Sequence, residues 1–322
     1  MRAKDDLSEE TSQEVAVSVL VAIDYGVDED AAWVDLRRSL KGLAAQDFDE
    51  PYDVVFLESA AHANRIPDDL RDILPALRIQ ISEGETAYDF LLDGARESRA
   101  ELFATLDADS VPDPSWLRHL VAAMRARPDA AAICGRTTYG DRGLIVRFLA
   151  ILQRAPLEAF RPGDQTYVTN NNAIFRRALF LRYPLTNEVG PFGTGLHGKR
   201  VRDAGHRLYC EPAAHVVHSH DGLRFEYAVR VHTGYASIRA RQIDPSLPRA
   251  WLVRLGHAAI PLIVVARWMN STLNCIRFHR AFGVPWYALP LAPFIALGVH
   301  LLEVPGMSRA FRGGPPMETP YR

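Results

Sequence analysis

The amino-acid sequence predicts an α/β fold built around a doubly wound sheet. Two observations support this prediction. Four short apolar runs occur before residue 107, and segments of helical periodicity separate them. Apolar runs bounded by polar sequence are typical of strands buried on both faces of a parallel sheet. Strands that alternate with helices build such a sheet, and ligands bind at the carboxyl ends of its strands.

The expected elements follow one another from residue 15 onward. Strands are expected at residues 15–23, 54–57, 78–81 and 101–106, with helices or short connectors at 32–43, 70–77 and 86–98. After these elements we expect a helix at 116–127 and a strand at 130–134, followed by a less regular stretch up to residue 168. A turn leading into a helix is expected at 170–183 and the end of a helix at 201–206. The last elements of this part are a strand at 208–217 and a helix at 225–241.

Composition excludes several classes of protein. Hydrophobic residues make up 48% of the 322 residues, which is enough for a large α/β domain with an appendage. The net charge is -2, so no overall positive field attracts nucleic acid. The three cysteines are scattered without a CxxC pair, which argues against a zinc cluster or disulfide framework and favours a reducing, cytoplasmic compartment.

The sequence divides into three parts. Residues 1–14 are charged and polar and lack the apolar stretch of a secretory signal, so we expect a disordered leader. Residues 15–245 are expected to form the main domain, and residues 246–322 a hydrophobic helical region.

Two carboxylates directly follow the fourth expected strand. In Asp107-Ala108-Asp109 the acidic residues stand at positions i and i+2, which point to the same side of an extended chain. Two hard oxygen ligands can converge there on one Mg²⁺ or Mn²⁺ that also binds substrate phosphates. The alternative is a polar turn in which Asp109 or Asp113 caps the following helix.

These motifs, with others in the same order, resemble family 2 glycosyltransferases, and most closely the rhamnosyltransferase-like branch. The resemblance covers roughly residues 15–240 and rests on residues 17–22, 53–58, Gly84, Asp93-Gly94, 106–109, 172–177, Arg200, Ala204-Gly205, Pro212 and 218–220. It implies a GT-A fold, with a Rossmann-like nucleotide-binding half and a mixed sheet. It also implies a nucleoside-diphosphate sugar as donor and transfer with inversion.

The resemblance assigns the sugar-donor site residue by residue. Ala22, Asp24 and Tyr25 stand where the family's first-strand loop meets the nucleotide base. Glu58 matches an acidic residue that contacts the nucleoside, and Asp93 stands where the family often has Asn. For Asp24 and Glu58 the alternative is helix capping or turn solvation.

The diphosphate and metal positions follow from the same resemblance. Asp107 would lie near the ribose and diphosphate and Asp109 would bind the metal, with His218 as a further ligand. Asn172 begins the family motif at residues 172–177. In the same motif, the Arg176 guanidinium can bind a phosphate through two hydrogen bonds. The alternatives are a His218 buried under the C-terminal helices and an arginine that is solvated at a helix start.

The acceptor side departs from the family pattern. Inverting transfer needs a general base, which the family supplies as a Glu-Asp pair ahead of the helix that ends in Ala-Gly. Counting back from Ala204-Gly205 places that pair at Gly193-Thr194, and residues 189–202 contain no acidic residue. Three interpretations remain open. Glu188 or His197 acts as a displaced base, or the reaction relies on the metal and on positioning with a weaker base. In the third, the protein binds the sugar nucleotide and catalyses little or nothing. The simpler alternatives are a solvated loop glutamate and a surface histidine.

The C-terminal region is markedly apolar. Arg254 and Arg267 bracket 12 residues, a helix of about 18 Å that is too short for a bilayer core of about 30 Å. Residues 283–302 are long enough to cross, but three prolines interrupt them, and Trp286 and Tyr287 resemble interfacial aromatics. We expect peripheral or monotopic contact with the inner face of the cell membrane; the alternative is a hairpin packed on the main domain or on a second subunit of a homodimer.

The expected function is transfer of a hexose or deoxyhexose from a nucleoside diphosphate to a cell-envelope glycan or lipid-linked acceptor. The alternative is a catalytically weak homologue that acts as a sugar-nucleotide-binding or scaffold subunit. A nucleotidyltransferase would need a glycine-rich loop after the first strand, and residues 23–30 contain only Gly26. A serine hydrolase is disfavoured because the chain has no GxSxG motif.

Overall fold

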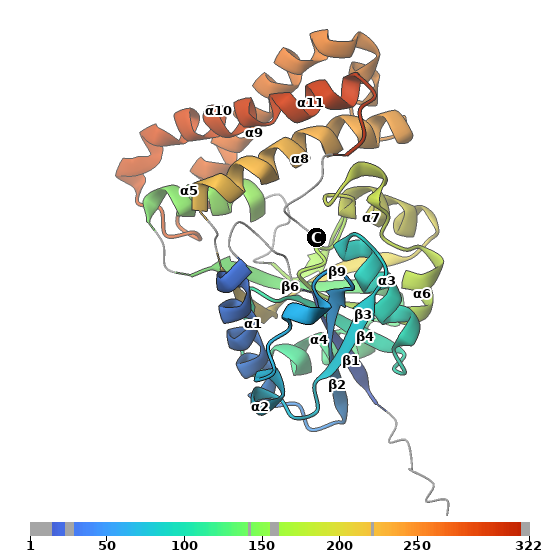
Figure 1. Cartoon of the computed structure of the whole chain (residues 1–322). Coiled ribbons are helices and arrows are strands. Elements are labelled where there is room, and N and C mark those ends of the chain that lie inside the picture. Colours follow the sequence, from blue (N-terminus) through green and yellow to red (C-terminus); the bar gives the residue numbers. More distant parts are fainter. Residues whose placement is uncertain (1–14, 23–28, 141–142, 155–160, 220–221, 317–322) are drawn as a thin grey trace, which may run out of the picture.

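The computed structural model describes residues 15–22, 29–140, 143–154, 161–219 and 222–316. Figure 1 shows a central sheet with helices on both faces, and a layer of helices that lies across the end of the sheet to which β1–β4 point. The expected leader, residues 1–14, lies outside the described residues.

The sheet is mixed, as expected for a GT-A fold. Its strand order is β3-β2-β1-β4-β8-β6-β9-β5, with β7 paired to β9. The first four strands are parallel, whereas β8 is antiparallel to both of its neighbours. The bounds are β1 Val17–Ala22, β2 Tyr52–Ser59, β3 Arg78–Ser82, β4 Leu102–Asp107, β5 Ser110–Pro112, β6 Ala130–Tyr139, β7 Gly163–Asp164, β8 Asn172–Arg176 and β9 Arg207–His218.

Three strands were not expected, namely β5, β7 and β8, and β8 is the longest of them. Residues 170–183 were predicted as a turn feeding a helix, but residues 172–176 form β8, in the middle of the sheet between β4 and β6. The segment has only five residues, and it is stabilised by pairing on both sides rather than by its own pattern. The helix follows directly as α6, residues Arg177–Arg182.

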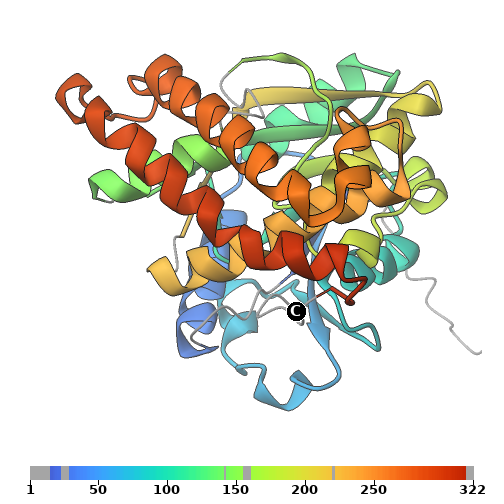
Figure 2. The ribbon, with the colours of Figure 1, turned by 90° about the horizontal axis from the view of Figure 1, so that it is seen from above.

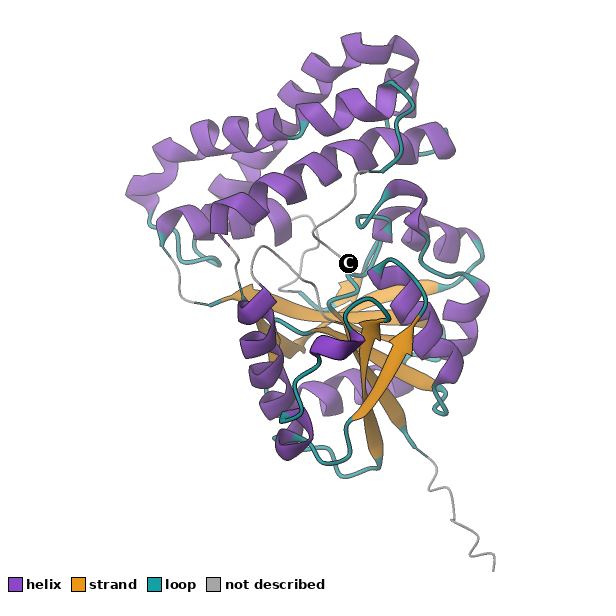
Figure 3. Ribbon diagram, viewed as in Figure 1, coloured by secondary structure: helices purple, strands orange, loops and turns teal. Residues whose placement is uncertain are grey.

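Helices cover both faces of the sheet and enclose two hydrophobic clusters. The apolar side chains of α1 and α4 pack on one face, and those of α3 and α6 on the other. Figure 3 shows this arrangement of helices around the strands. The bounds are α1 Glu29–Ala44, η1 Ala63–Arg65, α2 Leu70–Ile73, α3 Ala87–Glu97, α4 Trp116–Ala126, η3 Asn187–Val189 and α7 Thr194–Asp203.

The remaining helices form what we call the helical cap. It consists of α5 Leu144–Arg154, α8 Gly222–Ile243, η4 Ala250–Ala258, α9 Ala259–Phe278, η5 Trp286–Leu291, α10 Ala292–Leu302 and α11 Val304–Phe311. Seen from above in Figure 2, its helices lie across the sheet domain. Helix α5 falls in a stretch predicted to be irregular; its apolar residues pack with those of α9 and α10. The cap therefore includes α5 and α8, although both precede residue 246.

Two glycines allow the helices of the cap to pack closely. A Cβ on Gly306 of α11 would lie 1.8 Å from the Val231 carbonyl oxygen of α8. A Cβ on Gly234 of α8 would lie 2.0 Å from the Glu303 carbonyl oxygen. No side chain fits at such distances, so glycine at both positions sets how closely α8 and α11 approach.

The outer side of the cap is apolar. Two stretches, Ala250–Phe278 and Trp286–Phe311, are long and apolar enough to cross a membrane by length and composition. Trp286 is 76% exposed and Phe294 is 74% exposed. Helix α9 also exposes a row of apolar residues at helical spacing: Leu262, Val265, Met269, Leu273 and Ile276.

Arg267 corrects one expectation about this region. It was predicted to flank a short helix, but it lies inside α9, where its Nη1 is 2.7 Å from the buried Glu303 carboxylate. Pairing with a carboxylate lets the helix continue through the charged residue. Gly256, whose φ is 57°, interrupts the helical backbone within η4, before α9 begins at Ala259.

Candidate active site

The site is built where β4 ends and the chain turns into β5. Asp107 is the last residue of β4, and the Ala108 N–H donates to the Ala22 carbonyl at the end of β1. Strand β5 then pairs antiparallel with β9, which places Ser110 opposite His218. The pairing of two distant strands thus brings His218 beside the two aspartates.

The three side chains form a compact ligand set. His218 Nε2 lies 3.4 Å from Asp109 Oδ1 and 3.9 Å from Asp107 Oδ2. One ligand atom from each of the three residues lies within 4.8 Å of the others. All three are partly buried.

The tautomer of His218 suits metal binding. Its Nδ1 contacts the Ser219 carbonyl oxygen, which can only accept, so Nδ1 carries the proton. In the neutral ring Nε2 then presents a lone pair toward the carboxylates. Two carboxylates and one imidazole fit Mg²⁺ or Mn²⁺. The alternative role, capping of α4, does not hold, because the helix has no side-chain cap.

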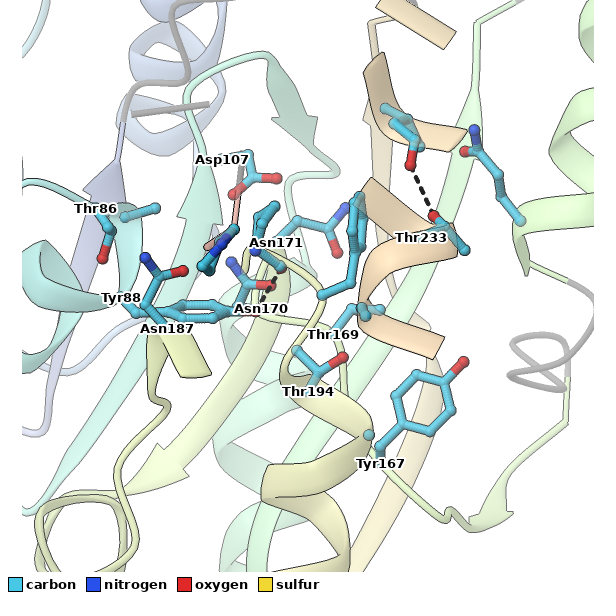
Figure 4. A pocket seen from close by; sticks show the side chains of 18 of the residues that line it. Thr86, Tyr88, Asp107, Tyr167, Thr169, Asn170, Asn171, Asn187, Thr194 and Thr233 are labelled. Carbon is cyan, nitrogen blue, oxygen red and sulfur yellow. Dashed lines mark hydrogen bonds between the residues drawn. The ribbon is translucent and has the colours of Figure 1, made fainter. Parts of the chain in front are cut away.

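A cleft of about 1380 Å³ opens over this ligand set. On one side lie the ends of the strands and the loops that follow them, including Asp107, Asp109 and His218. On the other side lies the helical cap, which contributes residues from α8, α9 and α10. Figure 4 shows Asp107 facing the space between the strand ends and Thr233 on α8. The sheet end and the cap therefore line one continuous cleft.

Several polar residues of the cleft were not anticipated. They include Thr86, Tyr88, Asn170, Asn171 and Asn187, whose side chains are labelled in Figure 4. Sequence reasoning chose Asn172 from a run of three asparagines, whereas the two before it line the cleft. A run of amides directly before a strand was the available signal.

Tyr88 fixes the backbone at Gly193, next to the position where the resemblance led us to expect a Glu-Asp pair. Its hydroxyl donates to the Pro191 carbonyl oxygen at 2.5 Å and accepts from the Gly193 N–H at 3.0 Å. Burial raises the pKa of Tyr88 well above its usual range, so the hydroxyl keeps its proton. The segment that includes Thr194 is thereby tied to α3.

The nucleoside side of the site is only partly formed by the expected residues. Ala22 lines the cleft. Asp24 and Tyr25 lie outside the described residues. Glu58 is buried at the end of β2, where its Oε1 accepts from the Ser59 N–H at 2.6 Å; Ser59 lines the cleft, and Glu58 does not.

Asp93 acts between β3 and α3. Its carboxylate accepts a 2.5 Å hydrogen bond from the Ser82 hydroxyl and lies 3.2 Å from Arg96. Ser82 lines the cleft, whereas Asp93 stands behind it. The structure thus places Asp93 as support for the loop that follows β3.

Asn172 and Arg176 serve the fold instead of the cleft. Asn172 is fully buried, and its Oδ1 accepts from the Trp116 indole N–H at 2.8 Å. Arg176 donates to main-chain carbonyls at the end of α4 and the start of β6, including Ala130 O at 2.9 Å. Both side chains hold the sheet to α4, so neither is in a position to bind a sugar nucleotide.

The two expected bases are also placed elsewhere. His197 is 4% exposed, its ring lies near Phe175 and Phe180, and burial lowers its pKa to about 4. Such a histidine is part of the core, not a surface residue. Glu188 is partly exposed and pairs with Arg200 at 2.9 Å, and hydrogen bonding to Arg200 lowers its pKa. It does not line the cleft, so the structure brings neither residue to the ligand set.

Other carboxylates do line the cleft. Beyond the two aspartates they are Glu83, Glu85, Glu226 and Glu303. Glu226 is buried on α8, where it pairs with Arg230 and accepts a 2.9 Å hydrogen bond from Gln153. Gln153 in turn contacts the Tyr139 hydroxyl, and the Tyr139 ring packs edge-on against His218.

Comparison with known proteins agrees with this geometry. Residues 29–183 match the sequence model of glycosyl transferase family 2, a segment that runs from α1 through α6 and includes Asp107 and Asp109. No curated protein matches the chain. The match supports a family 2 glycosyltransferase, and the mixed α/β sheet is consistent with a fold of the GT-A type.

Proposed function

We propose that the protein transfers a sugar from a nucleoside diphosphate to a cell-envelope glycan or lipid-linked acceptor, with metal assistance and inversion at the anomeric carbon. The observation that carries this proposal is the Asp107, Asp109 and His218 ligand set at the base of the cleft. Asp109 and His218 would hold Mg²⁺ or Mn²⁺, together with Asp107. A divalent ion there neutralises the charge that develops on the departing diphosphate.

The residues around the ligand set differ between the part of the cleft that would hold the nucleoside and the part that would hold the sugar. Ala22, Ser59 and the loop at residues 82–86 form the wall next to the nucleoside side of the sheet. Asn170 and Asn171 offer amide donors and acceptors of the kind that sugar hydroxyls need. The sugar to be transferred, a hexose or deoxyhexose, would lie between these amides and α8.

Glu226 is our candidate for the general base. It is a buried carboxylate on the cap side of the cleft, linked to His218 through Gln153 and Tyr139. A positioned base contributes about 100-fold or more to transfer. We expect Glu226→Gln to reduce the transfer rate by about that factor while nucleotide affinity stays unchanged. Glu188→Gln is the matched control and should transfer normally; equal losses in both variants would exclude Glu226.

The apolar outer side of the cap supports contact with the inner face of the cell membrane. Trp251, Trp286 and Tyr287 are exposed beside the aliphatic row of α9. The two apolar stretches also contain charged residues, which are Arg254, Arg267 and Arg277 in the first and Glu303 and Arg309 in the second. Of these, Arg267 and Glu303 pair with each other within the cap and line the cleft. This favours a cap that lies on the membrane over one that spans it. A second copy of the chain is the other candidate to cover this surface.

A sugar-nucleotide-binding subunit without turnover is the second candidate function. The absence of acidic residues at Gly193-Thr194 favours it. The two functions differ in whether a bound donor is consumed.

The test is a panel of UDP-, GDP- and dTDP-sugars with purified protein and Mn²⁺. We expect one donor to raise the melting temperature in a metal-dependent way and to be converted to the free nucleoside diphosphate when acceptor lipid extract is added. Binding without conversion would favour the binding subunit. No metal-dependent shift with any donor would refute the site itself.

A further inference from the structure

A small pocket lies next to the main cleft, between α8, η4 and α9. Its volume is about 110 Å³ and it is lined by Ser237, Arg241, Arg249, Leu252, Ile263, Ala266 and Arg267. Three of these residues are arginines and none is acidic. The volume is several times what one water needs, so a phosphate group fits. Ser237, Arg241 and Arg267 also line the main cleft, so the pocket adjoins it.

The three arginines are only partly neutralised. Arg267 pairs with Glu303 at 2.7 Å. Arg241 donates to main-chain oxygens, Pro248 O at 3.0 Å and Ser237 O at 2.5 Å, which hold the side chain without balancing its charge. The Arg249 side chain makes no ion pair with the described residues. Two guanidinium groups therefore lack a carboxylate in the part of the chain that the structure describes.

The charges also affect one another. Burial lowers the pKa of Arg241, and the positive charges of Arg267 and Arg249 lower it further. An anion between the three groups would relieve this repulsion. Guanidinium groups bind phosphate through two parallel hydrogen bonds, which makes phosphate the anion that best fits a set of arginines.

The surroundings of the pocket are apolar. The elements η4 and α9 that form its walls also expose Trp251, Leu255, Leu262 and Val265 on the outer side of the cap. A ligand at the arginines thus lies between a polar cleft and an apolar surface. A molecule with a phosphate group and a hydrocarbon tail matches both.

We propose that Arg241, Arg249 and Arg267 bind the phosphate group of a lipid, and that this lipid presents the acceptor hydroxyl to the cleft. The first part stands on the pocket alone, and the second rests on the proposed glycosyl transfer. The site would select acceptors by their phosphate, independently of the sugar nucleotide at Asp109.

The test measures the affinity of the full chain, in neutral detergent, for farnesyl phosphate, farnesol and inorganic phosphate. We expect farnesyl phosphate to bind at least about tenfold more tightly than either of the others, because only it offers both the charge and the tail. Equal binding of farnesol would refute the phosphate site, and equal binding of inorganic phosphate would refute the lipid.

Arg249 offers variants that separate charge from folding. Its backbone is left-handed, with φ of 60°, so Arg249→Gly removes the guanidinium at a position where glycine suits the backbone. We expect Arg249→Gly and Arg249→Gln to fold normally and to lose about tenfold or more in affinity for farnesyl phosphate. Arg254→Gln, an exposed arginine of η4 outside the pocket, should bind like the wild type. Wild-type affinity in both Arg249 variants would overturn the proposal.

The same samples distinguish this site from the sugar-donor site. Asp109→Asn should lose metal-dependent nucleotide binding and keep farnesyl phosphate binding. A wild-type protein that binds farnesyl phosphate and no nucleotide would refute the proposed transfer and leave the lipid site standing. The reverse result would refute the lipid site alone.

Discussion

The two sides of the cleft are constructed differently. On the sheet side, Asp107 and Asp109 come from one short motif at the end of a strand, and only His218 is brought from elsewhere. On the cap side, the ionic groups come from several helices, and one pair joins Arg267 of α9 to Glu303 at the start of α11. A strand end displays its functional residues in consecutive sequence, whereas a helical layer assembles them from distant positions. The sheet side is therefore visible in the sequence, and the cap side only in the structure.

The largest effect is expected from breaking the sheet side. Asp109→Asn removes a charged ligand from the metal set, and metal assistance supplies several kcal/mol of transition-state stabilisation. We expect metal-dependent transfer to fall by about 100-fold or more. Asp113→Asn is the matched control, because Asp113 follows the same strand turn, pairs with His215 of β9 and does not line the cleft. A similar loss in both variants would mean that the loop's fold, not the metal ligand, was disturbed.

The fold followed from the sequence wherever an element carried its own hydrophobic pattern. The four parallel strands and the helices between them lie where the sequence predicted them, and β1, β2 and β4 carry the continuous apolar runs of strands that are buried on both faces. Strand β8 and helix α5 were missed. Strand β8 has only five residues and is stabilised by pairing with strands from distant parts of the chain, so its own pattern is weak. Helix α5 has 11 residues, as many as α3 and α4, and is amphipathic, so its pattern was present in the sequence and was overlooked.

The site divides in the same way. Asp107 and Asp109 were predicted as metal ligands from their i, i+2 spacing after a strand together with the ordered family motifs around them, because the two aspartates alone fit a polar turn as well. Asn172, Arg176 and His197 were misplaced because their structural partners, such as Trp116 and the Ala130 carbonyl, are far away in the sequence. A buried polar residue looks like a site residue until its hydrogen-bond partner is known.

The next largest effect is expected from a change that weakens the packing of the helical cap and leaves the sheet side of the cleft unchanged. Gly306→Ala places a Cβ where the Val231 carbonyl oxygen is 1.8 Å away, so α8 and α11 must move apart. Such overpacking destabilises by about 1–3 kcal/mol. We expect a lower melting temperature and faster proteolysis of the C-terminal helices, with metal-dependent nucleotide binding retained.

Gly298→Ala on α10 is the control for that change. A Cβ there meets no atom within 4 Å, so the helix should gain up to about 1 kcal/mol from the better helix former. Loss of nucleotide binding in Gly306→Ala would show that the two sides are not independent.

A comparable but pH-dependent effect is expected at His197, which lies beneath the cleft. Its pKa is about 4 in the folded protein and about 6.5 when unfolded, so between these values only the unfolded state takes up the proton. Stability is unaffected at pH 7 and is lost as the pH falls below 6.5. The loss amounts to about 2 kcal/mol at pH 5.

Urea unfolding at pH 7 and pH 5 measures this loss. His197→Leu should remove the pH-dependent part, and His206→Gln at the other end of the same helix segment should keep it. An unchanged pH dependence in His197→Leu would place the titrating group elsewhere.

The smallest effect is expected at the contact between α3 and the segment at Pro191–Gly193, beside the position where a Glu-Asp pair was expected. Tyr88→Phe leaves the Pro191 carbonyl and the Gly193 N–H without the hydroxyl that serves both. We expect a loss of about 1–2 kcal/mol in unfolding free energy, since an unsatisfied buried polar group costs that much.

Tyr183→Phe is the control, because no hydrogen bond of its hydroxyl is found among the described residues, and it should cost less than about 0.5 kcal/mol. Because Thr194 and Gly195 line the cleft just beyond this joint, Tyr88→Phe should also weaken acceptor use more than nucleotide binding. Equal weakening of acceptor use and nucleotide binding would mean that Tyr88 supports the sheet side of the cleft directly. It would also mean that the segment at Gly193 does not form a separate binding surface for the acceptor.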